Sequence, residues 1–193
     1  MLHAVASPKP QANLSTKKAR LLEIIKEKSL LKGQFKLASG ATSDYYLDMK
    51  PTTFDPEGAA LVAEIVFDML AGDPVDSIGG LELGAVPIIA TVCARSWPDR
   101  PINGFVVRKE QKGHGTDKKI DGNFRNGENV VLFDDVTTKG GSVMQAVKAV
   151  RERGAKVTKI ITLVDRLEGA TENLQKEGIM LFPVFTTREL MGK

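Results

Sequence analysis

Short apolar runs rich in β-branched residues alternate with helical patterns through most of this chain, and this alternation constrains its fold more than any other feature. Strands are predicted at 75–78, 103–107, 129–133, 157–164 and 179–185, and helices at 55–72, 86–97 and 142–153. Strands that lack polar alternation are typical of parallel sheets covered on both faces. The chain is therefore predicted to be an α/β protein with a Rossmann-like open parallel sheet flanked by helices.

The N-terminal part does not follow this alternation. A helix capped by Ser15 or Thr16 is predicted to run to Leu31 and to end at Gly33. An extended stretch over 35–50 comes next, broken by a Ser-Gly turn. These two elements are expected to form a small hood over the edge of the sheet.

Domain organisation follows from these patterns. Residues 1–14 contain two prolines and scattered small residues, which is typical of a flexible N-terminal arm. Residues 15–193 are expected to form one domain, with the hood over about 15–52 and the core over about 53–193. At 193 residues the chain is long enough to bury a sizeable core without disulfides or metal.

Composition excludes several classes of protein. The chain has one cysteine, Cys93, and two histidines, so neither a disulfide scaffold nor a CxxC zinc or redox site is available. No apolar run approaches the roughly 20 residues of a membrane span, and the first 18 residues do not resemble a secretory signal. A soluble protein of a reducing compartment, and hence a cytoplasmic location, is expected.

The positive charge is concentrated in one segment. Residues 108–119 (RKEQKGHGTDKK) contain five Lys/Arg and two acidic residues, and therefore account for the whole formal net charge of +3. The segment has no aromatic residue, although nucleic-acid binders commonly interleave basic and aromatic residues. A compact polyanion such as a diphosphate fits this segment better than nucleic acid does. From charge alone, a solvated surface loop remains the simpler interpretation.

The most informative stretch is 129–142 (NVVLFDDVTTKGGS), in which an apolar strand leads through two acids and a hydroxyl- and glycine-rich turn into a helix. Ligands of open parallel sheets bind at the carboxyl ends of strands, where Asp134 and Asp135 are expected. The turn over 137–142 leads to a helix N-terminus, whose free N–H groups hold phosphate. Walker A spacing is absent. Because the acids, threonines and glycines occur in this order, a ribose-5-phosphate site is favoured over a merely solvated loop.

These segments resemble a known family. FDDVTTKGGS is similar to the phosphoribosyl diphosphate (PRPP) signature of the type I phosphoribosyltransferases, and RKEQKGHG is similar to the catalytic loop of the orotate phosphoribosyltransferases within it. FKLASGATSDYYLDMK, GGLELGAVPIIA and LVDRLE also match, in the family's order. The resemblance implies transfer of ribose 5-phosphate from PRPP to orotate, which yields orotidine 5'-monophosphate and diphosphate with Mg²⁺ in pyrimidine biosynthesis. It also implies a homodimer in which the loop closes over the partner subunit's site.

The resemblance also implies roles for individual residues. Lys112 and His114 match catalytic positions of the loop, and Thr138 and Arg166 match positions that contact orotate. No protein side chain is implied as a metal ligand. The positions that match PRPP-binding residues are Arg108, Lys109, Lys112, His114, Asp134, Asp135, Val136, Thr137, Thr138, Lys139, Gly140, Gly141 and Ser142.

Three positions depart from the family pattern. A lysine that often precedes the N-terminal Ser-Gly is replaced by Ala38, although Lys36 lies two residues earlier. Of an aromatic pair near the pyrimidine, Tyr46 is present but its neighbour is Leu47. Gly84 stands where a diphosphate-binding lysine can occur.

The residues also suggest a mechanism. No protein nucleophile is evident, so catalysis is expected to rest on stabilising the leaving diphosphate and excluding water. His114 is either a donor to the diphosphate or a solvent-exposed histidine between glycines. Arg166 is either a fork for the orotate carboxylate or a strand-end arginine paired with Asp165. A phosphoribosyltransferase for another base, and a PRPP-sensing regulator without catalysis, are the alternative functions.

Overall fold

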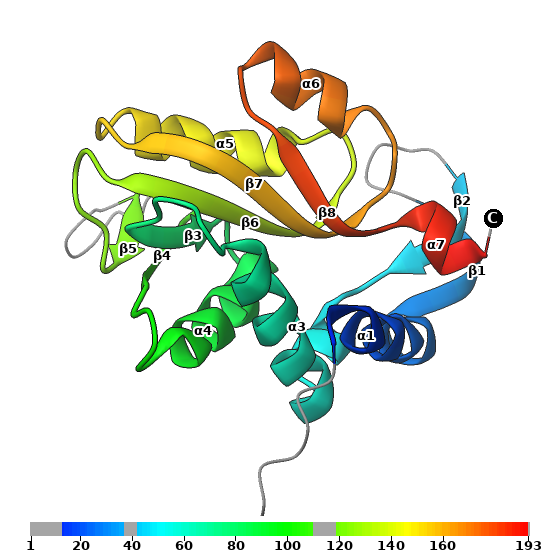
Figure 1. The fold of residues 1–193 in the computed structure, drawn as a ribbon. Coiled ribbons are helices and arrows are strands. Elements are labelled where there is room, and N and C mark those ends of the chain that lie inside the picture. The colour runs from blue at the N-terminus through cyan, green and yellow to red at the C-terminus, as the bar shows by residue number, and fades with distance from the viewer. Residues whose placement is uncertain (1–12, 37–41, 110–118, 193) are drawn as a thin grey trace, which may run out of the picture.

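A computed structural model describes residues 13–36, 42–109 and 119–192 of the chain. Its main feature is a six-stranded sheet in the order β5-β4-β3-β6-β7-β8 (Figure 1). Five strands are mutually parallel, and only β5 is antiparallel to its neighbour β4. The strands are β3 (Ser77–Gly80), β4 (Asn103–Val107), β5 (Ile120–Gly122), β6 (Asn129–Thr137), β7 (Lys156–Asp165) and β8 (Leu181–Thr186).

Helices cover both faces of this sheet. One face carries α3 (Pro56–Met69) and α4 (Ala85–Ser96), and the other carries α5 (Gly141–Arg151) and α6 (Ala170–Lys176) (Figure 1). Successive side chains of a strand point to opposite faces, and β6 illustrates this. Val131 and Phe133 belong to the core beneath α3 and α4, whereas Leu132 belongs to the core beneath α5. The predicted doubly covered α/β sheet is confirmed.

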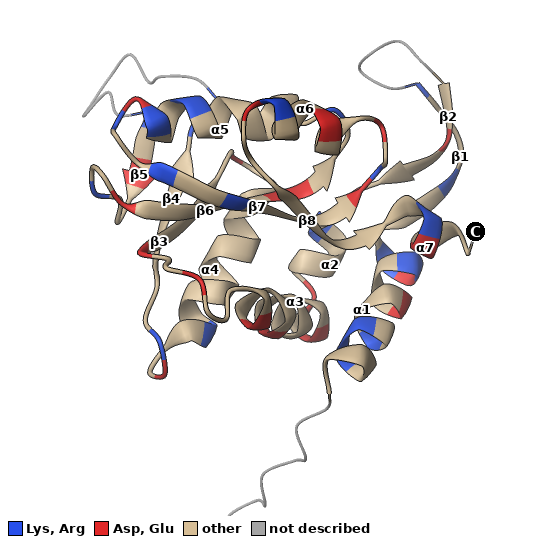
Figure 2. Cartoon of the chain, turned by 45° about the horizontal axis from the view of Figure 1, so that its top comes forward, with Lys and Arg blue, Asp and Glu red and all other residues tan. Residues whose placement is uncertain are grey.

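The N-terminal hood consists of α1 (Leu14–Lys28), an antiparallel hairpin of β1 (Leu30–Lys36) and β2 (Thr42–Leu47), and the short α2 (Lys50–Thr53). Helix α1 packs against α3, and Lys17 of α1 forms an ion pair with Glu64 at 2.8 Å. Figure 2 shows charges of both signs along α1, whereas α4 is almost free of them. The hood is thus attached to the core on the α3 side of the sheet.

The bounds of the first helix differ from the prediction. Asn13 caps α1, because its Oδ1 accepts a hydrogen bond from the Thr16 N–H at 2.9 Å. The helix ends at Lys28, and Leu31 belongs to β1, where it pairs with Tyr46. Pairing between β1 and β2 therefore outweighs the helical spacing of Leu30 and Leu31 in the sequence. Positions 1–12 of the predicted flexible arm lie outside the described residues.

The bounds of three strands in the sheet also differ from the prediction. β6 continues to Thr137 because its last residues pair with β7, so the two acids lie within the strand rather than after it. β3 starts at Ser77, two residues later than predicted, and β8 starts at Leu181. The sequence did not predict β5, whose three residues are too few for a periodic signal, nor the short helices α2, α6 and α7 (Thr187–Met191). Within the described ranges, no helix is both long and apolar enough to span a membrane.

Candidate active site

The order of the strands fixes where a ligand should bind. The chain continues from β3 to β4 on one side and returns to β6 on the other, so the strand order reverses between β3 and β6. In open α/β sheets the crevice outside the strand ends at such a point is the usual ligand site. Gly80 ends β3 opposite Phe133, and a Cβ on Gly80 would lie 2.5 Å from the Phe133 carbonyl oxygen. This close approach places the end of β3 directly beside the acid pair.

The acid pair, Asp134 and Asp135, lies in the last part of β6. The Asp134 Oδ2 accepts a hydrogen bond from the Thr137 hydroxyl at 2.9 Å, and the Asp135 Oδ1 accepts one from the Val136 N–H at 2.9 Å. Burial, together with the charge of Asp135, raises the pKa of Asp134 to about 7. Burial also raises the pKa of Asp135, while the positive charge of Lys50 opposes this. The pair therefore favours partners that donate hydrogen bonds or carry positive charge.

The turn over 137–142, which the sequence predicts to bind an anion, begins at the last residue of β6. Gly140 adopts a left-handed conformation (φ +81°) and precedes α5, whose N-terminus has no side-chain cap. Thr138, Lys139 and Ser142 are exposed. The Asn173 side-chain amide donates to the Lys139 carbonyl oxygen at 3.1 Å and fixes the turn. Uncapped N–H groups and the helix dipole favour a phosphate at this position.

The segment between β3 and α4 closes over the acid pair. A Cβ on Gly84 would lie 2.3 Å from the Asp135 carboxyl carbon, so no side chain fits there while Asp135 keeps its position. A lysine at position 84 would therefore require the Asp135 carboxylate to move. The same segment is tied to the end of β4, because the Glu82 Oε1 accepts a hydrogen bond from the Lys109 N–H at 2.8 Å.

The cationic segment is described only at its two ends. The Arg108 guanidinium forms an ion pair with Asp121 of β5, and the Lys119 ammonium donates to the Lys109 carbonyl oxygen at 2.8 Å. Lys112 and His114 lie outside the described residues, as does Ala38. The roles of the four basic residues toward the diphosphate remain predictions.

Arg166 follows β7 and lies beside the turn. Its N–H donates to the Thr137 carbonyl oxygen at 2.9 Å. Its side chain is 8% exposed, its Nε lies 2.8 Å from the Glu168 Oε1, and its guanidinium carbon lies 4.7 Å from the centre of the Tyr45 ring. The pairing of Arg166 with Asp165, one of the two interpretations from the sequence, is wrong, because the Asp165 Oδ1 accepts from the Leu167 N–H. Sequence spacing gave no signal that Tyr45 and Arg166 would meet.

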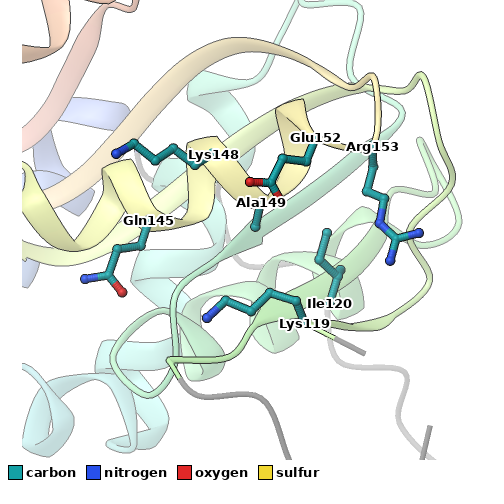
Figure 3. Close-up of a pocket in the computed structure, with 7 residues that line it drawn as sticks. All are labelled: Lys119, Ile120, Gln145, Lys148, Ala149, Glu152 and Arg153. Atoms are coloured by element: carbon teal, nitrogen blue, oxygen red, sulfur yellow. The ribbon is translucent and has the colours of Figure 1, made fainter. Parts of the chain in front are cut away.

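The structure thus brings the acid pair, the turn and Arg166 to one edge of the sheet. Among the described residues no cluster of three or more metal-binding side chains occurs. A separate cavity of about 450 Å³ lies between α5 and β5 and includes Lys119 and Arg153 (Figure 3). It contains neither acid of the pair, and its labelled side chains spread apart rather than converge (Figure 3).

Comparison with known proteins supports a phosphoribosyl-binding site at the acid pair and the turn. Residues 54–184 match the family model described as the phosphoribosyl transferase domain. Orotate phosphoribosyltransferase of Rhodopseudomonas palustris (strain BisB5) is 44% identical over 93% of this chain and 98% of its own length. The Methanocaldococcus jannaschii protein of that name is 45% identical over 91% of this chain and 98% of its own.

Solved structures give the same result. The Mycobacterium tuberculosis orotate phosphoribosyltransferase in complex with Fe(III) dicitrate has a TM-score of 0.81 and 34% identity, and the match covers 90% of this chain and 98% of that one. The structure of that enzyme in complex with PRPP has a TM-score of 0.77 and 31% identity, covering 91% and 99%. The fold and the site at its strand ends thus define a phosphoribosyltransferase of type I. Within that class, the chain belongs to the orotate phosphoribosyltransferase family.

Proposed function

We propose that this chain transfers the 5-phosphoribosyl group of PRPP to orotate, giving orotidine 5'-monophosphate and diphosphate in pyrimidine biosynthesis. The observation that supports this most directly is the acid pair at the strand-order reversal, followed by the uncapped turn before α5. Carboxylates beside a phosphate-binding turn match the two ends of a ribose 5-phosphate group. Family membership specifies orotate as the acceptor.

Each part of the site has a separate task in this proposal. The turn over 137–142 binds the 5-phosphate through backbone N–H groups and hydroxyls. Asp134 and Asp135 accept hydrogen bonds from the ribose hydroxyls. Arg166 offers a planar fork that matches the carboxylate of orotate, and Thr138 lies in the turn beside it. Binding both substrates at one strand edge aligns the base nitrogen with the ribose C1.

The departing diphosphate needs positive charge. We assign this task to Arg108, Lys109, Lys112 and His114, with Lys112 and His114 as the catalytic members. Donors aimed at charge that develops in the transition state are worth roughly a hundredfold or more in rate. Release of Arg108 from Asp121 would be required before its guanidinium could bind the diphosphate.

The donor set also fits Mg²⁺. The site offers two adjacent carboxylates but, in the described ranges, no cluster of three metal-binding side chains. Mg²⁺ is commonly held by substrate phosphates, waters and one or two carboxylates, so Asp134 and Asp135 would contact it or its waters. When bound, it would neutralise part of the charge on the diphosphate.

We also propose a cytoplasmic homodimer in which segment 108–119 of one subunit serves the partner's site. Mixing chains that carry Lys112→Ala with chains that carry Asp135→Asn tests this arrangement. If the segment acts across the interface, mixed dimers regain one intact site, and activity exceeds that of either variant alone. If each subunit uses its own segment, mixing restores nothing.

The central experiment measures orotate consumption and diphosphate release by the purified chain with PRPP and Mg²⁺. Orotate loss that requires both PRPP and Mg²⁺ is expected. Adenine and uracil replace orotate in parallel assays, and turnover of one of them alone would favour a phosphoribosyltransferase for another base. Absence of turnover, combined with DNA binding that weakens steeply with salt, would favour a PRPP-sensing regulator.

A further inference from the structure

Arg166 is held by side chains from two distant parts of the chain. Tyr45 comes from β2 of the hood, and its ring centre lies 4.7 Å from the guanidinium carbon. Glu168 follows β7, and its Oε1 lies 2.8 Å from the Arg166 Nε. The angle at Nε falls outside hydrogen-bond geometry, so this contact is an ion pair. The Tyr45 ring and the Glu168 carboxylate therefore each contact the guanidinium.

The backbone around Arg166 is also fixed. The Arg166 N–H donates to the Thr137 carbonyl oxygen at 2.9 Å, and its carbonyl oxygen accepts from the Thr187 hydroxyl at 3.1 Å. The next residue, Leu167, has φ +59°, a left-handed conformation that leucine rarely adopts, and Asp165 supports it by accepting the Leu167 N–H at 2.9 Å. The side chain of Arg166 thus starts from a rigid backbone position.

The two terminal nitrogens of the Arg166 guanidinium, Nη1 and Nη2, differ from Nε in their contacts. In the part of the chain that the structure describes, neither Nη1 nor Nη2 of Arg166 donates a hydrogen bond to a protein acceptor. A side chain that is 8% exposed has already lost most of its contact with water and most of its rotamer freedom. A carboxylate that binds both terminal nitrogens would therefore lose little free energy to ordering of the Arg166 side chain, because folding has already fixed that side chain.

We propose that Tyr45 and Glu168 are positioning residues that hold the Arg166 fork ready for the carboxylate of the pyrimidine substrate. This inference rests on the proposed function, because it takes orotate as the acceptor. It assigns to Tyr45 a role that couples the hood to the substrate site. It assigns to Glu168 a role in substrate affinity rather than in the chemical step.

Steady-state kinetics of three variants and one control test the proposal. Glu168→Gln and Tyr45→Leu are expected to raise the orotate KM about tenfold, while kcat and the PRPP KM change less than about twofold. Tyr45→Phe keeps the ring and should restore most of the orotate affinity that Tyr45→Leu loses. Glu172→Gln is the matched control, because Glu172 is an exposed carboxylate on α6, and its kinetics should equal those of the parent chain.

A second readout separates a positioning role from a general loss of structure. Uracil lacks the carboxylate of orotate, so its inhibition constant should not change in Glu168→Gln. A parallel weakening of orotate, uracil and PRPP would show damage to the whole site and would overturn the proposal. An unchanged orotate KM in both Glu168→Gln and Tyr45→Leu would overturn it as well.

The side-chain N–H signal of Arg166 in NMR spectra keeps this test independent of the proposed function. Relaxation of the Nε–H signal is expected to report a rigid guanidinium in the parent chain and in Glu172→Gln, and a more mobile one in Glu168→Gln. If the parent chain does not convert orotate but this pattern holds, the proposed function fails and the positioning of Arg166 stands. If the signal is the same in all three proteins, Glu168 does not position Arg166.

Discussion

Replacing Asp134 with Asn should stabilise the ligand-free protein at neutral and alkaline pH. Burial and the charge of Asp135 raise the pKa of Asp134 from its ordinary value of 3.8 to about 7. The native state therefore binds more protons than the unfolded state between these two values, and the unfolding free energy falls as pH rises through this range. Below pH 4 both states are protonated, so the destabilising effect is absent there and complete only above pH 7.

The size of the effect on the free energy of unfolding follows from the shift in the pKa of Asp134. A difference of about three pKa units corresponds to about 4 kcal/mol, and entry of water and relaxation around the carboxylate reduce it to about 2 kcal/mol. Asn removes the charge but keeps an acceptor for the Thr137 hydroxyl, which donates to Asp134 at 2.9 Å. We therefore expect Asp134→Asn to be about 2 kcal/mol more stable at pH 8, and to lose affinity for PRPP.

Urea unfolding of the ligand-free protein at pH 4.5 and pH 8 measures this effect. The gap in unfolding free energy between Asp134→Asn and the parent chain should be larger at pH 8 than at pH 4.5. Asp99→Asn is the control, because Asp99 forms a surface ion pair with Arg95 at 3.5 Å and its loss should change stability by less than about 1 kcal/mol at either pH. Equal stability of Asp134→Asn and the parent chain at pH 8 would refute the reasoning.

Four other substitutions test separate parts of the site. Gly84→Ala puts a Cβ against the Asp135 carboxylate, so PRPP affinity measured by calorimetry should fall at least about tenfold. An unchanged Kd would mean that the segment between β3 and α4 moves to accept the Cβ without affecting the site. Lys112→Ala should lower kcat about a hundredfold, and a normal kcat would remove Lys112 from catalysis. His114→Gln should alter the pH–rate profile if His114 donates to the diphosphate, whereas an unchanged profile would indicate a solvent-exposed histidine. Arg166→Lys should raise the orotate KM because lysine lacks the planar fork, and an unchanged KM contradicts the assignment.

The acid pair illustrates how much of the site can be predicted from the local sequence. The order of apolar strand, two acids, hydroxyl turn and helix was enough to predict a phosphate-binding turn, and the structure has a turn with a left-handed Gly140 between β6 and α5. Phosphate binding at this turn stays a prediction. It was not enough to place Asp134 and Asp135 within the strand, because their extended conformation comes from pairing with β7. That pairing depends on residues far along the chain.

Other features of the site depended on contacts that spacing does not encode. The partners of Arg166 come from the hood and from the segment after β7. The family pattern marked Gly84 as a departure, but only the structure shows that a Cβ there would lie 2.3 Å from the Asp135 carboxyl carbon. Leu31 fits the helical pattern, yet it pairs with Tyr46 in the hairpin.

By itself, the sequence determined the class of fold, the parallel sheet, the position of the turn after β6 and the position of the positive charge. Each of these depends on side-chain periodicity or on the conformational preferences of neighbouring residues, which are local properties of the chain. The tertiary structure alone decided the end of β6, the environment that raises the pKa of Asp134, and the partners that hold Arg166. These depend on burial and on contacts between distant segments, whose free energies arise only when the chain has folded.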